Sequence, residues 1–378
     1  MDLRYGLNPG QRARAVPIGG RLPFRVLSGE PSYVNLLDAL SAWHLVREIS
    51  ESLGLAAAAS FKHVSPAGAA IPGRLDDVMR ETWSAVGEVS PIANAYIRAR
   101  DADPKSSYGD FVAVSEPVDQ DLVEVLRRTA NDGVIAPGFE PGTVDALKAK
   151  KGGRLLVLEV EPGVARAEWE RREIFGVSLE QQAPQSIDRT LPALRGLPSP
   201  QLDDAVLAML AVRYTQSNSV GLARDGMMIG IGADQQSRVD CVRLAGGKAD
   251  SWWLRRHPRL RQIEYKSAVP RQDRINLLTR LLEGDLTESD DRALRDALAG
   301  VPPVLSRDER SSWLQLLSGV VLVSDGMVPF RDNVDQAARH GVNYLLEPGG
   351  SIRSDEVTEA CRAHGIVHVQ TGIRLFCH

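Results

Sequence analysis

The sequence contains few cysteines, few aromatic residues and little net charge. Its three cysteines are odd in number and show no metal-ligand spacing; they are Cys241, Cys361 and Cys377. We expect them to be reduced thiols of a cytoplasmic protein, which argues against a disulfide framework. The net charge of −4 and the lack of a basic tail argue against nucleic acid as a partner.

Long apolar runs are also missing. No run approaches the ~20 residues that a membrane helix needs. The first segment, MDLRYGLNPGQRAR, lacks the apolar core of a signal peptide. We therefore expect no membrane partner. A chain of 378 residues with ordinary apolar and charged fractions favours two domains, or one unit with a double core.

Strand-like and helix-like patterns alternate in two separate stretches of the chain. The first stretch predicts, in order, a strand at 56–61, a helix at 75–86, a strand at 110–116, a helix at 119–132 and strands at 133–138 and 154–161. The second predicts a strand at 320–326, a helix at 332–341, a strand and turn at 342–350, a helix at 354–365 and a strand at 366–372. Alternation of this kind favours α/β layers with a mainly parallel sheet.

The segments between these stretches predict a helix at 202–215, a strand at 226–233, a polar helix from 234 and a helical insertion up to about 315. The segment LRGLPSPQL (194–202) is the most plausible domain boundary. We expect Asp332 and Ser354 to cap the two C-terminal helices at their starts. Gly341 and Gly365 are expected to close them.

One short segment, FKHVSPAGAA (61–70), places Lys62 and His63 side by side where an apolar strand stops before a Ser-Pro-Ala-Gly loop. Adjacent side chains of a regular strand point to opposite faces, so the pair serves one site only if the backbone leaves strand geometry there. An imidazole suits general-base work near neutral pH. The alternative is a surface lysine beside a histidine that binds a carbonyl group.

Two further segments are polar and flank predicted regular structure. YTQSNSV (214–220) carries Asn218, whose amide suits a carbonyl oxygen that gains charge; the alternative is an ordinary polar turn. GIGADQQSR (230–238) is a glycine-rich turn from strand to helix without a complete nucleotide-binding motif. Asp234 is expected to cap this helix, and Arg238 lies within reach of a phosphate or carboxylate. The Trp252–Trp253 pair is typical of a core or an interface.

Ten segments together resemble the AICAR transformylase family, in the same order and over essentially the whole chain. They are LRYGLNPGQ (3–11), SGEPSYVNLLDALSAWHLV (28–46), FKHVSPAGAA, SSYGDFVAVSE, NDGVIAPGFEP, REIFGVSLEQ, RYTQSNSV, IGIGADQQSRVDCVRLAGGKA, SDGMVPFRDNVDQA and IRLFCH. The resemblance implies a pair of cytidine-deaminase-like α/β/α domains, at 1–198 and 199–378, the second with a helical insertion at about 250–315. It implies no zinc, and the chain lacks the H-x-E and P-C-x-x-C ligands of true deaminases.

The resemblance also implies a reaction and its partners. Formyl passes from 10-formyltetrahydrofolate to the 5-amino group of an aminoimidazole carboxamide ribotide (AICAR), in purine synthesis. The family is usually fused behind an inosinate cyclohydrolase domain, and this chain begins where that domain would end. We therefore expect ring closure by a separate cyclohydrolase. The family's site lies across a homodimer, so residues from two copies are expected to meet.

Individual site residues follow from the matched segments. The resemblance implies that His63 is the base, helped by Lys62, and that Asn218 stabilises the formyl oxygen. Positions that match the ribotide site are Arg4, Tyr5, Gly10, Arg238, Met327 and Arg374. Positions that match the folate site are Gly109, Asp132, Val239 and Asp332. A structural potassium site of some members corresponds to Thr215, Ser217, Ser219, Asp325 and Leu375.

Several residues depart from the family pattern. NPHQ becomes NPGQ with Gly10, DAFFPF becomes DGMVPF with Met327, IGAGQ becomes IGADQ with Asp234, and the final FHH becomes FCH. The changes at residues 10 and 327 remove a polar contact and a stacking face from the acceptor pocket. Three functions therefore stay open: AICAR formylation, the same chemistry on a related ribotide or nucleoside, and a non-catalytic ribotide- or folate-binding partner.

Overall fold

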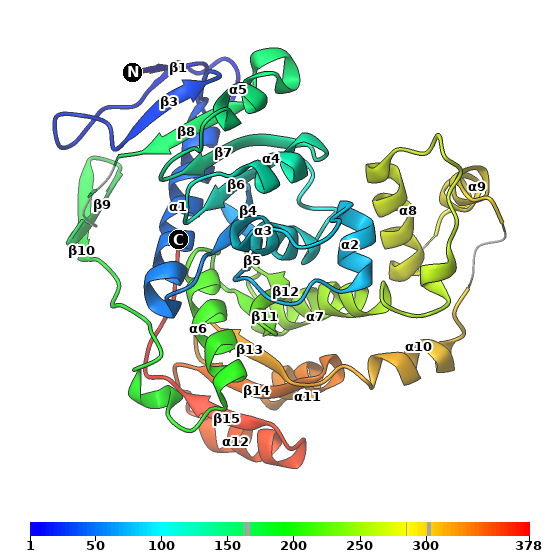
Figure 1. Ribbon diagram of the computed structural model, residues 1–378. Helices are drawn as coiled ribbons and strands as arrows, with labels where there is room; N and C mark the ends of the chain where they lie inside the picture. Colours follow the sequence, from blue (N-terminus) through cyan, green and yellow to red (C-terminus); the bar gives the residue numbers. More distant parts are fainter. Residues whose placement is uncertain (162, 164–166, 285, 301–303) are drawn as a thin grey trace.

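An eleven-stranded sheet runs through the whole protein (Figure 1). The computed structural model describes residues 1–161, 163, 167–284, 286–300 and 304–378. The strand order is β15-β14-β13-β11-β12-β5-β4-β6-β7-β8-β3. The bounds are β3 Phe24–Ser28, β4 Ala58–Lys62, β5 Ser65–Ala70, β6 Asp110–Val114, β7 Asn131–Ala136, β8 Leu156–Val160, β11 Val220–Arg224, β12 Met227–Gly232, β13 Val320–Ser324, β14 Val342–Glu347 and β15 Val367–Gln370.

One strand pattern occurs twice in this sheet. The order β5-β4-β6-β7-β8 of the first half matches β12-β11-β13-β14-β15 of the second. In each half a two-stranded hairpin is followed by one antiparallel and two parallel pairings. The halves join where β12 runs antiparallel to β5 through the pair Met227–Ala70. The expectation of a mainly parallel sheet is wrong. Only four of the ten pairings of described strands in this sheet are parallel, because the two central hairpins make the pairings at the centre antiparallel.

Matching glycines show how closely the two halves follow one plan. A Cβ atom on Gly68 of β5 would lie 2.1 Å from the Ala99 carbonyl oxygen of helix α3 (Pro91–Asp101). A Cβ atom on Gly230 of β12 would lie 2.1 Å from the Ala245 carbonyl oxygen of helix α7 (Arg238–Leu254). Only glycine permits such a close approach of helix and strand.

Helices cover both faces of the sheet and bury its alternating side chains. Helices α1 (Tyr33–Leu53) and α6 (Ser199–Arg213) pack with Ala59, Phe61 and Phe111 on one face. The other face carries α3 and α7 over Ala58, Val112 and related side chains. The remaining helices are α2 Asp77–Trp83, α4 Gln120–Arg127, α5 Thr143–Lys148, α8 Arg271–Glu283, α9 Glu288–Ala297, α10 Arg307–Leu314, α11 Arg331–Ala337 and α12 Ser354–Ala363.

Short elements complete the chain. They are strands β1 Asp2–Leu3, β2 Ala13–Arg14, β9 Trp169–Ile174 and β10 Val177–Gln182, and the 3-10 turns η1 Lys150–Gly153, η2 Pro192–Leu194, η3 Leu260–Gln262 and η4 Ala338–His340. Figure 1 shows α8, α9 and α10 together on one side of the sheet, as expected for the helical insertion. None of the described helices is long and apolar enough to cross a membrane.

Several local expectations need correction. The Ser-Pro-Ala-Gly segment is not a loop but the start of β5. Pro66 fits there because, among the described residues, β5 pairs with β12 only at Ala70, so the missing N–H of Pro66 breaks no ladder on that side. Asp332 caps no helix, because α11 begins one residue earlier with Phe330 at the N-cap.

Of the other predicted helix ends, one start needs correction and two ends are confirmed. Ser354 is the first residue of α12 rather than its cap, and its hydroxyl donates to the Ser351 carbonyl oxygen instead. Gly341 and Gly365 follow their helices in the left-handed conformation, with φ of 70° and 66°, which confirms both as helix ends. The predicted boundary at 194–202 falls where the chain enters α6 at Ser199, and the division into two domains stays a prediction.

Candidate active site

The turn between β4 and β5 presents His63 at the edge of the sheet. Lys62 pairs with Ser65, so His63 and Val64 alone form the turn, with φ of 54° and 59°. Both residues are left-handed, as a type I′ hairpin turn requires, and a β-branched valine is unusual there. The backbone therefore leaves strand geometry directly after Lys62, as the sequence analysis required for a shared site. His63 is exposed, and Lys62 is half-buried.

A buried aspartate of α1 holds this turn in place. The carboxylate of Asp38 accepts a hydrogen bond from the Val64 amide at 2.6 Å. Burial raises the pKa of Asp38, and the Asp132 carboxylate acts in the same direction, whereas the Val64 amide, His63 and Lys62 lower it. Asp38 thus links the turn to the helix behind it and places a carboxyl group beside His63 and Lys62.

The loop before β6 forms the other wall of the turn. Lys62 donates through Nζ to the Tyr108 carbonyl oxygen at 2.6 Å. Gly109 follows with φ of 77° and donates to the Ala130 carbonyl oxygen at 3.0 Å. A Cβ atom on Gly109 would lie 3.9 Å from Oδ1 of Asp132, so the two predicted folate residues are neighbours. Asp132 is exposed and pairs with Lys151 at 2.8 Å.

A second cluster surrounds Asn218, just before β11. Its Oδ1 accepts from Nη2 of Arg238 at 2.6 Å, and its Nδ2 donates to the Gln235 and Gln236 carbonyl oxygens at 2.9 and 3.2 Å. Asn218 is half-buried and lines an open cavity of about 480 Å³ together with Asp234, Phe376 and other residues. Its side-chain amide is therefore oriented by a charged donor and faces a space that a ligand can enter.

Arg238 is buried at the start of α7 and serves as the centre of this cluster. Its guanidinium donates to the Asp325 carboxylate and, at 2.8 Å, to the Ser324 hydroxyl. Asp234 does not cap α7, which is a correction: the N-cap is Ser237, and Asp234 lies earlier in the loop with φ of 58°. The loop turns back at Asp234, whose amide donates to the Gln216 carbonyl oxygen at 2.9 Å.

Three of the five predicted potassium residues meet directly. Ser219 donates from its amide to Oδ2 of Asp325 at 3.0 Å, and Leu375 donates to the Asp325 carbonyl oxygen at 2.8 Å. The hydroxyl of Ser219 is buried and has no hydrogen-bond partner within the described part of the chain. Thr215 is buried nearby in sequence and donates to the Val212 carbonyl oxygen, and Ser217 binds the backbone of Cys377. Hydroxyl, carboxylate and carbonyl oxygens are suited to a hard cation. Across the described residues, no group of three or more His, Cys, Asp and Glu side chains forms a metal centre.

The remaining predicted residues lie at the surface. Arg4 stacks over Tyr5 with 4.8 Å from its guanidinium carbon to the ring centre, and Arg374 lies over Phe376 at 4.9 Å. Met327 is 45% exposed. Open space surrounds the position that a Cβ atom of Gly10 would occupy. Asp332 is exposed in the first turn of α11, and Val239 is half-buried in the first turn of α7.

The two clusters stay separate within one chain. The first contains Lys62, His63, Gly109 and Asp132, and the second contains Asn218, Arg238 and Asp325. Among the described residues, no hydrogen bond or ion pair joins them. Asp38 was not among the predicted site residues, although a charged residue between Leu37 and Ala39 in an apolar helix is a recognisable signal of a buried polar contact.

Comparison with known proteins assigns the chain to a class. Residues 1–248 match the family described as "AICARFT/IMPCHase bienzyme", and the chain belongs to that family. Among its relatives is the "Bifunctional purine biosynthesis protein PurH" of Elusimicrobium minutum (strain Pei191), to which it is 29% identical over 386 aligned positions. That alignment covers 100% of this chain and 58% of the relative. The resemblance noted in the sequence is therefore confirmed at the level of the family.

Proposed function

We propose that the protein transfers formyl from 10-formyltetrahydrofolate to the 5-amino group of AICAR. The observation that carries this proposal is the exposed turn in which His63 follows Lys62 and is held from behind by a buried aspartate. The family to which the chain belongs combines such a transferase with a cyclohydrolase by its description. The reaction needs a base because an aromatic amine conjugated to a carboxamide is a poor nucleophile.

In the proposed reaction, His63 takes the proton that the amine loses as its nitrogen attacks the formyl carbon. The bond between that carbon and the folate nitrogen then breaks, and the folate nitrogen takes up a proton. Lys62 lies beside the base, with Nζ fixed on the Tyr108 carbonyl oxygen. General-base catalysis of this kind contributes ~10²–10⁴ in rate.

Asn218 is proposed to stabilise the negative charge that develops on the formyl oxygen. The contact from Arg238 fixes Oδ1, so that Nδ2 faces outward toward carbonyl groups. The formyl oxygen would replace the longer of these contacts, the 3.2 Å bond to Gln236. Because Arg238 is buried against Asp325, we assign it to positioning Asn218, and we assign the ribotide phosphate to the exposed Arg4 and Arg374.

The folate is proposed to lie against Gly109 and Asp132, next to the base, with Val239 and Asp332 contributing from the second half. The exposure of Asp132 and Asp332 and the open backbone at Gly109 support this assignment. A potassium ion, where bound, would be held by Thr215, Ser217, Ser219, Asp325 and Leu375, and the unpartnered Ser219 hydroxyl supports that fit. It would supply positive charge that fixes the chain around Asn218.

We further propose that the site is completed between two copies of the chain. Among the described residues, no hydrogen bond or ion pair joins the His63 and Asn218 clusters, which supports this arrangement. So does the hairpin β9–β10, whose residues are all exposed and include Phe175 and Leu179 at 103% and 55%. An isolated hairpin is marginally stable in water, so a partner surface is expected to cover it.

Mixing two inactive variants tests the shared site. His63→Ala and Asn218→Ala dimers, dissociated and reassociated together, should regain up to about a quarter of wild-type activity, because half of the dimers then carry one intact site. Each variant reassociated alone should stay inactive. Complete inactivity of the mixture, with dimers demonstrated by light scattering, contradicts a site shared between copies.

The acceptor pocket supports a second candidate, formyl transfer to a related ribotide or nucleoside. Gly10 and Met327 stand where the family pattern has a histidine and a phenylalanine, and Asp234 adds a negative charge near Asn218. A Cβ atom at residue 10 would meet no other atom within 4 Å, so Gly10→His is the variant to test. A Gly10→His, Met327→Phe double variant that gains activity on AICAR would favour this alternative.

The direct test follows tetrahydrofolate formation by the purified protein from 10-formyltetrahydrofolate and AICAR. Turnover of ~1–10³ per second supports the AICAR assignment. Folate binding without turnover on AICAR, but with turnover on another ribotide or nucleoside amine, supports the second candidate. Binding with no formylated acceptor in a panel contradicts both and leaves a non-catalytic partner.

A further inference from the structure

The second half of the protein carries a cavity at the place equivalent to the His63 turn. Arg224 pairs with Met227, so Asp225 and Gly226 alone form the β11–β12 turn, with φ of 53° and 76°. Counted along the repeated strands, Arg224 and Asp225 correspond to Lys62 and His63. This turn also rests on a buried aspartate of the preceding helix. Asp204 of α6 accepts from the Asp225 and Gly226 amides at 3.0 and 2.6 Å.

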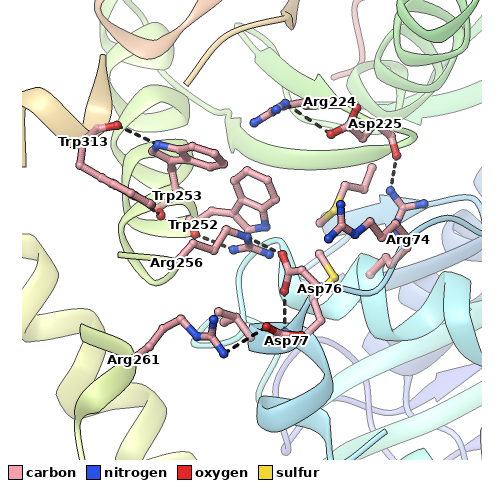
Figure 2. Close-up of a pocket in the computed structure, with 14 residues that line it drawn as sticks. Arg74, Asp76, Asp77, Arg224, Asp225, Trp252, Trp253, Arg256, Arg261 and Trp313 are labelled. Carbon is pink, nitrogen blue, oxygen red and sulfur yellow. Dashed lines mark hydrogen bonds and ion pairs between the residues drawn. The ribbon is translucent and has the colours of Figure 1, made fainter. Parts of the chain in front are cut away.

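The cavity beside this turn has a volume of about 620 Å³ and lies between the two halves and the helical insertion (Figure 2). That volume is in the range of sites for small organic ligands. Its apolar wall includes Val78, Met79, Met227 and Trp313. A cavity of this size and composition can bury most of a small molecule.

Positive charge dominates the polar part of the lining. Five arginines and three aspartates line the cavity: Arg74, Arg98, Arg224, Arg256, Arg261, Asp76, Asp77 and Asp225. Arg224, Arg256 and Arg261 are paired with aspartates at 3.4, 2.7 and 3.3 Å. Arg74 is exposed and has no hydrogen-bond or ion-pair partner in the described part of the chain. Figure 2 places it across the cavity from Trp253 and Trp313.

Trp252 and Trp253 form part of the cavity wall. Trp252 is 5% exposed, and its Nε1 is buried without a hydrogen-bond partner among the described residues. Because solvent does not reach this N–H, we assign it no contact with a ligand. The faces of Trp252 and Trp253 are already covered by Arg256 and Arg224, at 3.8 and 5.1 Å, so the ring faces are not open for stacking.

We propose that this cavity binds a phosphate monoester that carries an apolar or aromatic group. Arg74, Arg224 and Arg261 reach the lining from three different segments, which suits an anion with three free oxygens better than a carboxylate with two. Met79, Met227 and Trp313 of the lining are proposed to contact the apolar group. The site is distinct from the His63 and Asn218 clusters, with which it shares no residue.

Isothermal titration with AMP tests the proposal, in the absence and presence of saturating AICAR. AMP should bind under both conditions with a Kd below about 1 mM. Adenosine and inorganic phosphate should each bind at least tenfold more weakly. Arg74→Glu should raise the Kd for AMP at least tenfold, because it reverses the unpaired charge while breaking no contact of the folded chain.

Arg292→Glu is the matched control. Arg292 is exposed on α9, forms no hydrogen bond or ion pair in the described part of the chain and lies outside the cavity, so this variant should bind AMP as the wild type does. Tryptophan fluorescence gives a second readout, since Trp252, Trp253 and Trp313 line the cavity. Loss of AMP binding when AICAR is added, equal affinity of Arg74→Glu and wild type, or no binding at all overturns the proposal. None of these outcomes bears on formyl transfer, which the tetrahydrofolate assay measures separately.

Discussion

The turns β4–β5 and β11–β12 have the same backbone and different side chains. Both are two-residue turns with positive φ at each position. In both, backbone amides of the turn donate to a buried aspartate of the preceding helix. The first carries His63 and Val64 where the second carries Asp225 and Gly226. The second therefore uses a glycine where the first accepts a β-branched residue in a conformation that disfavours it.

This difference shows which residues of the repeated turn serve stability and which serve the proposed reaction. A glycine at residue 226 is what the hairpin requires for stability. The first turn has valine in place of this glycine, and it presents a proton acceptor, His63, at the edge of the sheet. Strained backbone of this kind is found at active sites. The comparison predicts that catalysis depends on the first turn and that stability depends more on the second.

The largest expected effect is the loss of activity in His63→Ala. We expect kcat/KM to fall by ~10²–10⁴, because Asp225 in the other turn cannot replace the base. Initial rates of tetrahydrofolate formation measure the change. His364→Ala, which removes an imidazole that pairs with Asp335 outside the site, should keep wild-type rates. Full activity of His63→Ala would remove His63 from the mechanism.

The next effect is on stability, in Gly226→Val. A Cβ atom at residue 226 would lie 2.8 Å from Cγ1 of Ile71, and φ is 76°. Strain and overpacking together should cost about 2–4 kcal/mol of unfolding free energy, measured by urea denaturation. Gly54→Val has a similar φ of 65° but open space around it, so it should cost less. Equal losses would show that packing at the second turn is unimportant.

A third effect is a change in how stability depends on pH in Asp204→Asn. Burial raises the pKa of Asp204 to about 7, whereas its unfolded value is near 3.8. The native state therefore holds the proton more tightly, and stability should fall between about pH 4 and pH 7, by up to about 1.4 kcal/mol per pH unit. Asp204→Asn should flatten this slope, as measured by denaturation at several pH values. Asp38→Asn should act in the same direction, because the pKa of Asp38 is also raised. A slope unchanged in both variants contradicts this account.

Much of the sheet could be predicted from sequence, because its parallel strands are short apolar runs between amphipathic helices. Strands β6, β7, β8, β13, β14 and β15 lie within or beside the expected segments. The central hairpins were harder, since SPAGAA in β5 contains a proline and a glycine that usually end strands. Helix α1 was not assigned from its pattern either, and its buried Asp38 interrupts the apolar stripe.

The candidate site shows the same division. The residue pattern alone singled out Lys62 and His63 at the end of an apolar strand and Asn218 after an apolar helix. Asp38, which holds the turn of His63, could not be found in this way, because it is distant in sequence and meets the turn only through a tertiary contact. The internal correspondence of the two turns was also invisible, because the residues at equivalent positions share backbone conformation rather than identity.

The smallest expected effect is in Val64→Gly, which makes the first turn resemble the second. Relief of the left-handed strain on a β-branched residue should favour the folded state by ~1–2 kcal/mol, and the added freedom of the unfolded chain should oppose it by ~0.5–1 kcal/mol. A net gain of about 0.5–1 kcal/mol is expected, since the Asp38 contact uses the backbone amide and survives. The same change loosens His63, so kcat should fall while stability rises. Denaturation and steady-state rates measured on one preparation separate the two effects. A variant that is less stable than the wild type would show that Val64 stabilises the turn by packing. The left-handed conformation of Val64 would then not be a loss of stability that accompanies the position of His63.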